Sequence, residues 1–152
     1  PQLILAICWG FSVLIPWAAS ESNLYGGFPL LFCWLSTILW TFGFDTVYAM
    51  SDKEDDKKLG LNSSAIRLKD KAHIVVSISY FFTSLLLGFA GYLVGVKLIF
   101  WLIWFSTSII MQVEVWKINL LSASDKEYSR HFRNQVLIGG LFLFGLIIGR
   151  TI

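Results

Sequence analysis

The chain has 152 residues, of which 56% are hydrophobic and only 14% are charged, and its formal net charge is +2. A soluble domain carries roughly 25% charged residues, so this composition excludes an ordinary water-soluble globular protein and indicates an integral membrane protein. The sequence has no phosphate-binding P-loop, no serine–histidine–aspartate arrangement and no basic patch for nucleic acid.

Five segments approach the roughly 20 apolar residues that a membrane-spanning helix needs. They are residues 3–19, 28–50, 73–95, 98–121 and 135–149. The last is short and rich in glycine, so we expect it to span only where the bilayer thins or where flanking residues help. Lipid cannot satisfy backbone polar groups, so helices are the plausible form for all five. The sequence therefore predicts an all-α, multi-pass transmembrane helical bundle of about five helices.

The chain begins at Pro1, inside an apolar run. No basic segment opens this run and no small-residue cleavage site follows it, so it does not fit a signal peptide. We expect the chain to be a piece of a longer protein.

Polar residues within or beside the apolar segments need a separate interpretation. His73 and His131 lie at segment starts, where we expect them near water and not bound to metal. Glu114 and Lys117 are three residues apart, and we expect a local ion pair between them. Glu114 and Gln112 remain candidates for function, because a polar or ionisable group at membrane depth is costly to keep.

Lysine and arginine residues concentrate in two connections between segments. The connection after the second segment holds Lys53, Lys57, Lys58, Arg67, Lys69 and Lys71. The connection after the fourth holds Lys126, Arg130 and Arg133. Basic loops favour the cytoplasmic side, so we expect both connections there. A bacterial inner membrane is the expected location, with an organelle membrane as the alternative.

The first basic connection contains an aspartate-rich stretch, residues 45–65, with five carboxylates and three lysines. If the second helix continues through it, one face of roughly 100° gathers most of the acidic side chains. The residues on that face are Asp45, Tyr48, Asp52, Asp55, Asp56 and Leu59. Asp52 and Asp56 are one turn apart and repel each other. Mg²⁺ suits one or two carboxylates together with substrate phosphates, so the stretch predicts a magnesium–diphosphate site.

The stretch also suggests two other interpretations. A run of charges is often only a solvated acidic loop between two helices. A calcium-binding EF-hand loop is excluded, because Lys57 stands where that loop needs glycine and Ser63 where it needs glutamate.

The pattern DxxYAMxDxxDDxKxGxxSxA over residues 45–65 resembles the second aspartate-rich motif of the UbiA superfamily of intramembrane prenyltransferases. It is most similar to the 4-hydroxybenzoate polyprenyltransferase branch. One departure is Asn62, where that pattern has a basic residue. The resemblance implies that residues 1–152 form the C-terminal portion of a single transmembrane prenyltransferase domain with about nine helices.

The resemblance also implies an activity. Members transfer a polyprenyl group from a polyprenyl diphosphate to an aromatic acid, here 4-hydroxybenzoate, in ubiquinone- or plastoquinone-type biosynthesis. Mg²⁺ is the expected cofactor and the lipid bilayer the expected surroundings, with no nucleic acid involved. Carried over by position, Asp52 and Asp56 are the first candidates for binding metal. Asp45 is a weaker one, because it lies about 10 Å from Asp52 along a continuous helix.

Four further residues are candidates for binding substrate. Tyr48 is expected to help shelter a carbocation-like prenyl group, and Asp55 to act through water. Lys58 and Arg67 are expected to contact diphosphate oxygens, because charge-assisted hydrogen bonds are strong.

The resemblance also points to what these residues lack. The family's first motif, NDxxDxxxD, does not occur in the 152 residues, so we expect the chain alone to be inactive without the N-terminal helices. Two alternatives stay open: a sister enzyme that uses homogentisate, a naphthoate, a chlorophyllide or haem, and a non-catalytic multi-pass transporter or assembly protein.

Overall fold

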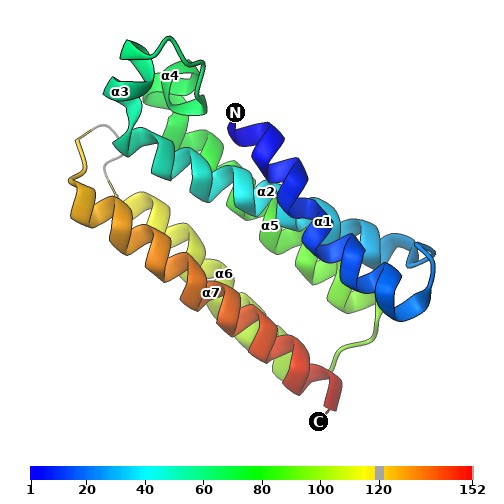
Figure 1. Cartoon of the computed structure of the whole chain (residues 1–152). Helices are drawn as coiled ribbons and strands as arrows, with labels where there is room; N and C mark the ends of the chain where they lie inside the picture. Colours follow the sequence, from blue (N-terminus) through cyan, green and yellow to red (C-terminus); the bar gives the residue numbers. More distant parts are fainter. Residues whose placement is uncertain (119–121, 152) are drawn as a thin grey trace.

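The computed structural model describes residues 1–118 and 122–151 (Figure 1). Helices form every regular element of this described part. They are α1 (Gln2–Glu21), α2 (Gly27–Ser51), α3 (Lys53–Lys58), α4 (Ser64–Leu68), the 3₁₀-helix η1 (Lys69–Lys71), α5 (Ala72–Leu93), α6 (Leu98–Lys117) and α7 (Asp125–Thr151).

Five helical stretches are long and apolar enough to cross a membrane, which confirms the predicted all-α multi-pass bundle. The fifth differs from the prediction. It spans Asp125–Thr151, so it begins ten residues before the predicted start and is not short. The basic residues Lys126, Arg130 and Arg133 thus lie on the first turns of α7 and not in a loop. The predicted end of the fourth segment, residues 119–121, lies outside the described residues.

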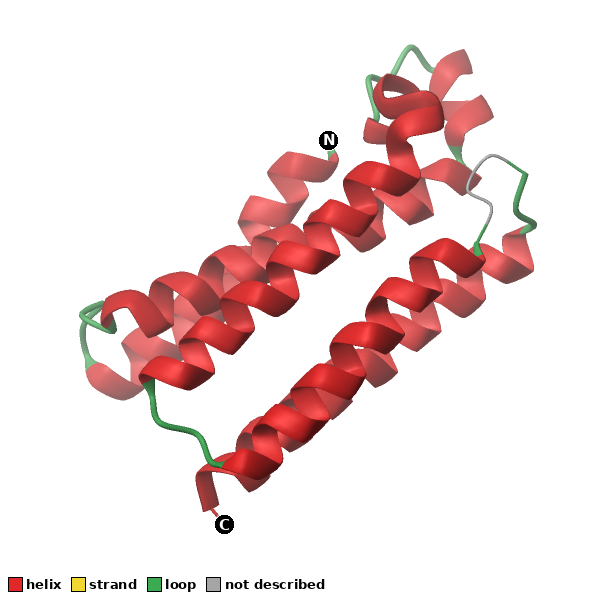
Figure 2. Ribbon diagram, turned by 180° about the vertical axis from the view of Figure 1, so that it is seen from behind, coloured by secondary structure: helices red, strands yellow, loops and turns green. Residues whose placement is uncertain are grey.

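The long helices form two layers. α1, α2 and α5 make one layer, with α2 packed on both of its neighbours, and α6 and α7 make the other (Figures 1 and 2). The layers meet along two seams, one between α5 and α6 and one between α2 and α7. The short helices α3 and α4 lie at the end of the bundle that also carries the N-terminus (Figure 1).

The interior is tightest where α2 crosses α5. A Cβ atom added to Gly43 would lie 2.4 Å from Cε1 of Tyr80, whose ring is fully buried. Glycine at this position therefore lets the two helices approach. Val47, Val76 and Met111 continue the same buried cluster toward the aspartate-rich end.

The second helix does not continue through the aspartate-rich stretch, and the prediction of one helical face over residues 45–59 is wrong. α2 ends at Ser51 and α3 begins at Lys53. Asp52 lies between them with φ −97° and ψ 6°. The break places Asp45 and Tyr48 on the bundle, Asp52 at the junction, and Glu54, Asp55 and Asp56 on a separate short helix.

Candidate functional site

The aspartate-rich segment is closed by a helix C-cap that depends on Gly60. The N–H of Gly60 bonds to the carbonyl of Lys57, and the N–H of Leu61 bonds to the carbonyl of Asp56 at 2.9 Å. These two bonds define a Schellman motif, whose position after the cap needs a left-handed residue. Gly60 has φ +67°, which explains why glycine stands here.

The next residues tie the segment to the bundle. Ala65 is fully buried, so α4 approaches α2 closely. The hydroxyls of Thr46 and Ser64 are 2.9 Å apart, and the N–H of Ser64 donates to Oε1 of Gln2 at 2.8 Å. Side chains from α1 and α2 thus hold α4 in place and position α3 at the end of the bundle.

Two of the carboxylates of α3 are paired with lysines of the same helix. Nζ of Lys57 lies 2.6 Å from Oε1 of Glu54, and Nζ of Lys58 lies 2.8 Å from Oδ1 of Asp55. Asp55 and Lys58, both predicted to contact substrate, are therefore paired with each other on the exposed surface.

Asp52 and Asp56 form no ion pair with any residue in the described part of the chain. The N–H of Asp56 bonds to the carbonyl of Asp52 at 2.8 Å, so these two residues keep the one-turn spacing despite the break. They are the carboxylate pair of this segment that lysine does not neutralise.

The ion pair between Asp55 and Lys58 shifts the pKa of both of its members. The hydrogen bond from Lys58 lowers the pKa of Asp55, and that pair raises the pKa of Lys58. A lowered carboxyl pKa means that the pair stabilises the segment above the ordinary aspartate pKa and loses this effect as pH falls through the lowered value.

We expect Lys58→Gln to raise the pKa of Asp55 toward its ordinary value. Carboxyl ¹³C chemical shifts followed through an acid titration measure this pKa. Lys53→Gln is the matched control, because it removes a charge of the same segment that does not contribute to the lowered pKa of Asp55. An unchanged Asp55 pKa in Lys58→Gln would show that the ion pair does not form in the membrane-bound protein.

A cavity of about 670 Å³ opens beside the end of α2, between α1, α2 and α7. Asp45 and Tyr48 line it, together with Trp9, Phe44 and Phe132. The ring centroid of Phe132 lies 5.8 Å from that of Phe44 and 6.3 Å from that of Tyr48. A second cavity of about 260 Å³ continues along the same α2–α7 seam and shares part of this lining.

The predicted site residues therefore fall into separate places. Asp45 and Tyr48 face the aromatic cavity, whereas Asp52 is exposed and Asp56 is half-buried on the neighbouring short helix. Arg67 is exposed on α4 and pairs with no carboxylate of the described residues.

Asp52 and Asp56 offer two carboxylates without an ion-pair partner among the described residues, a type of donor that Mg²⁺ takes. No cluster of three or more histidine, cysteine, aspartate or glutamate residues suited to metal occurs within residues 1–118 and 122–151. A fully protein-made metal cage is thus absent from that part. Mg²⁺ accepts one or two carboxylates and fills its other positions with water or phosphate oxygens, which matches a two-carboxylate donor set.

Sequence reasoning missed a buried polar network around His131. This residue was predicted to lie near water, and that prediction is wrong because its side chain is 2% exposed. Nε2 of His131 lies 3.1 Å from the Tyr80 hydroxyl and 3.4 Å from Nε2 of Gln135. Nε1–H of Trp40 donates to Oε1 of Gln135 at 2.9 Å. The network links α2, α5 and α7, and two of its members, Trp40 and Gln135, also line the smaller cavity.

The predicted ion pair on α6 is present but long, with 3.9 Å between Nζ of Lys117 and Oε1 of Glu114. Glu114 accepts a shorter bond of 2.7 Å from Nδ2 of Asn134 on α7. Gln112 exchanges hydrogen bonds with Ser77 on α5, at 2.7 and 3.1 Å. Glu114 and Gln112, the two candidates for function on α6, thus each link α6 to a neighbouring helix through hydrogen bonds.

The chain is similar in sequence to one protein family and to several known enzymes. A sequence model described as the UbiA prenyltransferase family matches residues 1–148. A 4-hydroxybenzoate solanesyltransferase of Synechocystis sp. is 36% identical over 154 residues, which cover 98% of this chain and 50% of that protein. A 4-hydroxybenzoate octaprenyltransferase of Idiomarina loihiensis is 32% identical over 148 residues, covering 97% of this chain and 51% of that protein.

The chain spans about half the length of these curated relatives. No solved structure matches it.

Proposed function

The chain belongs to the UbiA prenyltransferase family, and we propose that the full-length protein transfers a polyprenyl group from a polyprenyl diphosphate to 4-hydroxybenzoate. The product would serve the biosynthesis of a ubiquinone- or plastoquinone-type prenylquinone. The observation that carries the proposal is the unneutralised carboxylate pair of Asp52 and Asp56 at the membrane end of α2, in a chain 36% identical to a 4-hydroxybenzoate solanesyltransferase.

In this proposal, Asp52 and Asp56 hold Mg²⁺, which would neutralise the diphosphate and make it a better leaving group. Asp56 is fixed one turn after Asp52 by the backbone bond between them. Lys58 and Arg67 supply positive charge to the diphosphate oxygens. Lys58 must leave Asp55 to do so, and the exposed surface position makes that exchange inexpensive.

The aromatic cavity is the proposed place for the reacting end of the prenyl chain. Tyr48, Phe44 and Phe132 surround it with ring faces and edges. Aromatic faces carry negative potential that attracts a cationic carbon, and their bulk keeps water away from it. Asp45 is the one carboxylate of the motif that lines this cavity, and we assign it to orienting the aromatic acceptor.

We also infer that the aspartate-rich end of the bundle is cytoplasmic in a bacterial inner membrane. The start of α7 and the α2–α5 connection both carry basic residues, and they lie at the same end of the bundle (Figure 1). Clustered lysine and arginine at one end favour the cytoplasmic side.

The test is an acceptor panel with the full-length protein in liposomes, Mg²⁺ and a labelled polyprenyl diphosphate. We expect labelled product with 4-hydroxybenzoate and little with homogentisate or a naphthoate. Transfer to one of the latter would make the protein a sister enzyme. No transfer to any acceptor, with correct membrane insertion, would contradict the enzymatic proposal.

A further inference from the structure

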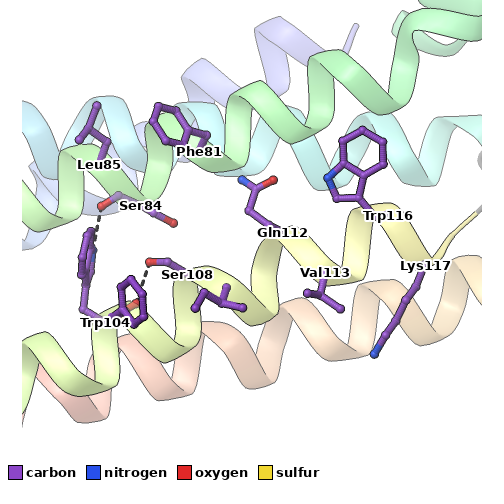
Figure 3. Close-up of a pocket in the computed structure, with 11 residues that line it drawn as sticks. Phe81, Ser84, Leu85, Trp104, Ser108, Gln112, Val113, Trp116 and Lys117 are labelled. Carbon is purple, nitrogen blue, oxygen red and sulfur yellow. Dashed lines mark hydrogen bonds between the residues drawn. The ribbon is translucent and has the colours of Figure 1, made fainter.

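A long apolar groove of about 460 Å³ follows the seam between α5 and α6 (Figure 3). Phe81 and Leu85 line it from α5, and Phe105, Ile109 and Val113 line it from α6. These large apolar side chains lie on helices long enough to span the membrane, so a hydrocarbon chain is the kind of molecule that this lining suits.

The groove is separate from the proposed active site. α2 packs on α5 and α6 packs on α7, and the two pairs meet through α5–α6 on one side and α2–α7 on the other. Asp45 and Tyr48 open into the cavity on the α2–α7 side. The groove therefore lies on the opposite side of the bundle.

Three of the polar side chains that line the groove, Trp104, Ser108 and Gln112, already form hydrogen bonds within the protein. Gln112 exchanges two hydrogen bonds with Ser77. Nε1–H of Trp104 donates to the Ser84 carbonyl at 2.8 Å, and the Ser108 hydroxyl donates to the carbonyl of Trp104 at 2.7 Å (Figure 3). A polar ligand would find few free hydrogen-bond partners here. A hydrocarbon chain can lie against these side chains without breaking any of their hydrogen bonds.

The length of the groove matches one leaflet of a bilayer. Trp104 and Lys117 both line it, and their separation along α6 corresponds to about 20 Å at 1.5 Å per residue. The hydrocarbon core of a bilayer is about 30 Å thick, so half of it is about 15 Å. A lipid chain that starts near Lys117 fits within the groove along its whole length.

At the aspartate-rich end of the bundle, the groove ends at a positive charge, the side chain of Lys117. The Lys117 side chain is 65% exposed, and its nearest carboxylate oxygen, on Glu114, is 3.9 Å away. Glu114 already accepts a 2.7 Å bond from Asn134, so the ammonium of Lys117 is weakly held. His73, on the first turn of α5, contacts the ring of Trp116 with 5.6 Å between centroids. The start of α5 thus lies at the same end as Lys117.

From these features we propose that the α5–α6 groove binds one chain of an anionic phospholipid, with its phosphate at Lys117. The apolar lining takes the chain, and the ammonium of Lys117 selects a negative headgroup. The proposal concerns lipid binding and does not depend on the proposed reaction.

Native mass spectrometry of the full-length protein, titrated with dioleoyl phosphatidylglycerol or dioleoyl phosphatidylcholine, tests this site. We expect tighter binding of the anionic lipid, and Lys117→Gln should reduce that preference about fivefold while leaving phosphatidylcholine binding unchanged. Lys126→Gln, at an exposed lysine of α7 outside the groove, is the matched control. Ile109→Trp should fill the groove and weaken binding of both lipids, because Ile109 is 48% exposed and faces outward.

Three outcomes would overturn the proposal. The first is equal binding of the two lipids by the unaltered protein. The second is a preference that Lys117→Gln and Lys126→Gln reduce equally, which would indicate a general surface charge effect. The third is exclusion of lipid by a second copy of the protein, seen as a dimer that Ile109→Trp dissociates.

Discussion

Replacement of Asp52 or Asp56 by alanine in the full-length protein is expected to lower prenyl transfer by about 100-fold or more. The reason is that, of the four carboxylates in residues 52–56, Asp52 and Asp56 are the two that lysine does not neutralise. Loss of residues that only support a metal ligand costs 10- to 100-fold, so loss of a ligand itself should reach at least the upper end. Initial rates at saturating and limiting Mg²⁺ measure the effect.

Glu54→Ala is the matched control for this prediction. Glu54 is an exposed carboxylate of the same short helix, and it is paired with Lys57. We expect this variant to keep near-normal turnover and all three variants to insert into the membrane. If Asp52→Ala or Asp56→Ala retained near-normal turnover, neither carboxylate would be needed for metal.

The substitution Gly43→Ala is expected to lower the free energy of unfolding by about 1–3 kcal/mol, the usual cost of overpacking a well-packed core. The added Cβ would meet the ring of Tyr80 at 2.4 Å. That ring cannot move away easily, because it is fully buried, stacks on His131 and shares a hydrogen bond with it.

Gly140→Ala is a matched control on α7, because a Cβ atom there would have no neighbour within 4 Å. Alanine is a better helix former than glycine by up to about 1 kcal/mol, so this variant should be as stable as the original or more so. Unfolding in detergent, followed by far-ultraviolet circular dichroism, compares the two. Equal stability of both variants would mean that α2 and α5 do not approach at Gly43 as described.

The long apolar helices were predictable because their composition alone identifies them. The start of α7 was not, because most of its first ten residues are charged or polar and so carry little hydropathy signal. A local signal was nevertheless present. Ser124 donates from its N–H and its hydroxyl to the carboxylate of Glu127, and the N–H of Glu127 bonds to the backbone carbonyl of Ser124. The bond from the Ser124 N–H to the Glu127 carboxylate is the glutamate half of a capping box, whose sequence pattern is serine followed three residues later by glutamate.

The candidate site was predictable only in part. The motif identified its residues, but a continuous helical period could not reveal the break at Asp52 that separates Asp45 and Tyr48 from the other carboxylates. The network of His131 depends on Tyr80, which is 51 residues away in sequence. Contacts of that kind come from helix packing, which a local pattern does not encode.

Binding of Mn²⁺ in place of Mg²⁺, followed by electron paramagnetic resonance with the full-length protein and geranyl diphosphate, tests the proposed metal site most directly. We predict that the double variant Asp52→Ala/Asp56→Ala loses at least one diphosphate-dependent Mn²⁺ ion that the unaltered protein and Glu54→Ala both retain. An unchanged number and affinity of bound ions in the double variant would contradict the assignment of this carboxylate pair to the metal.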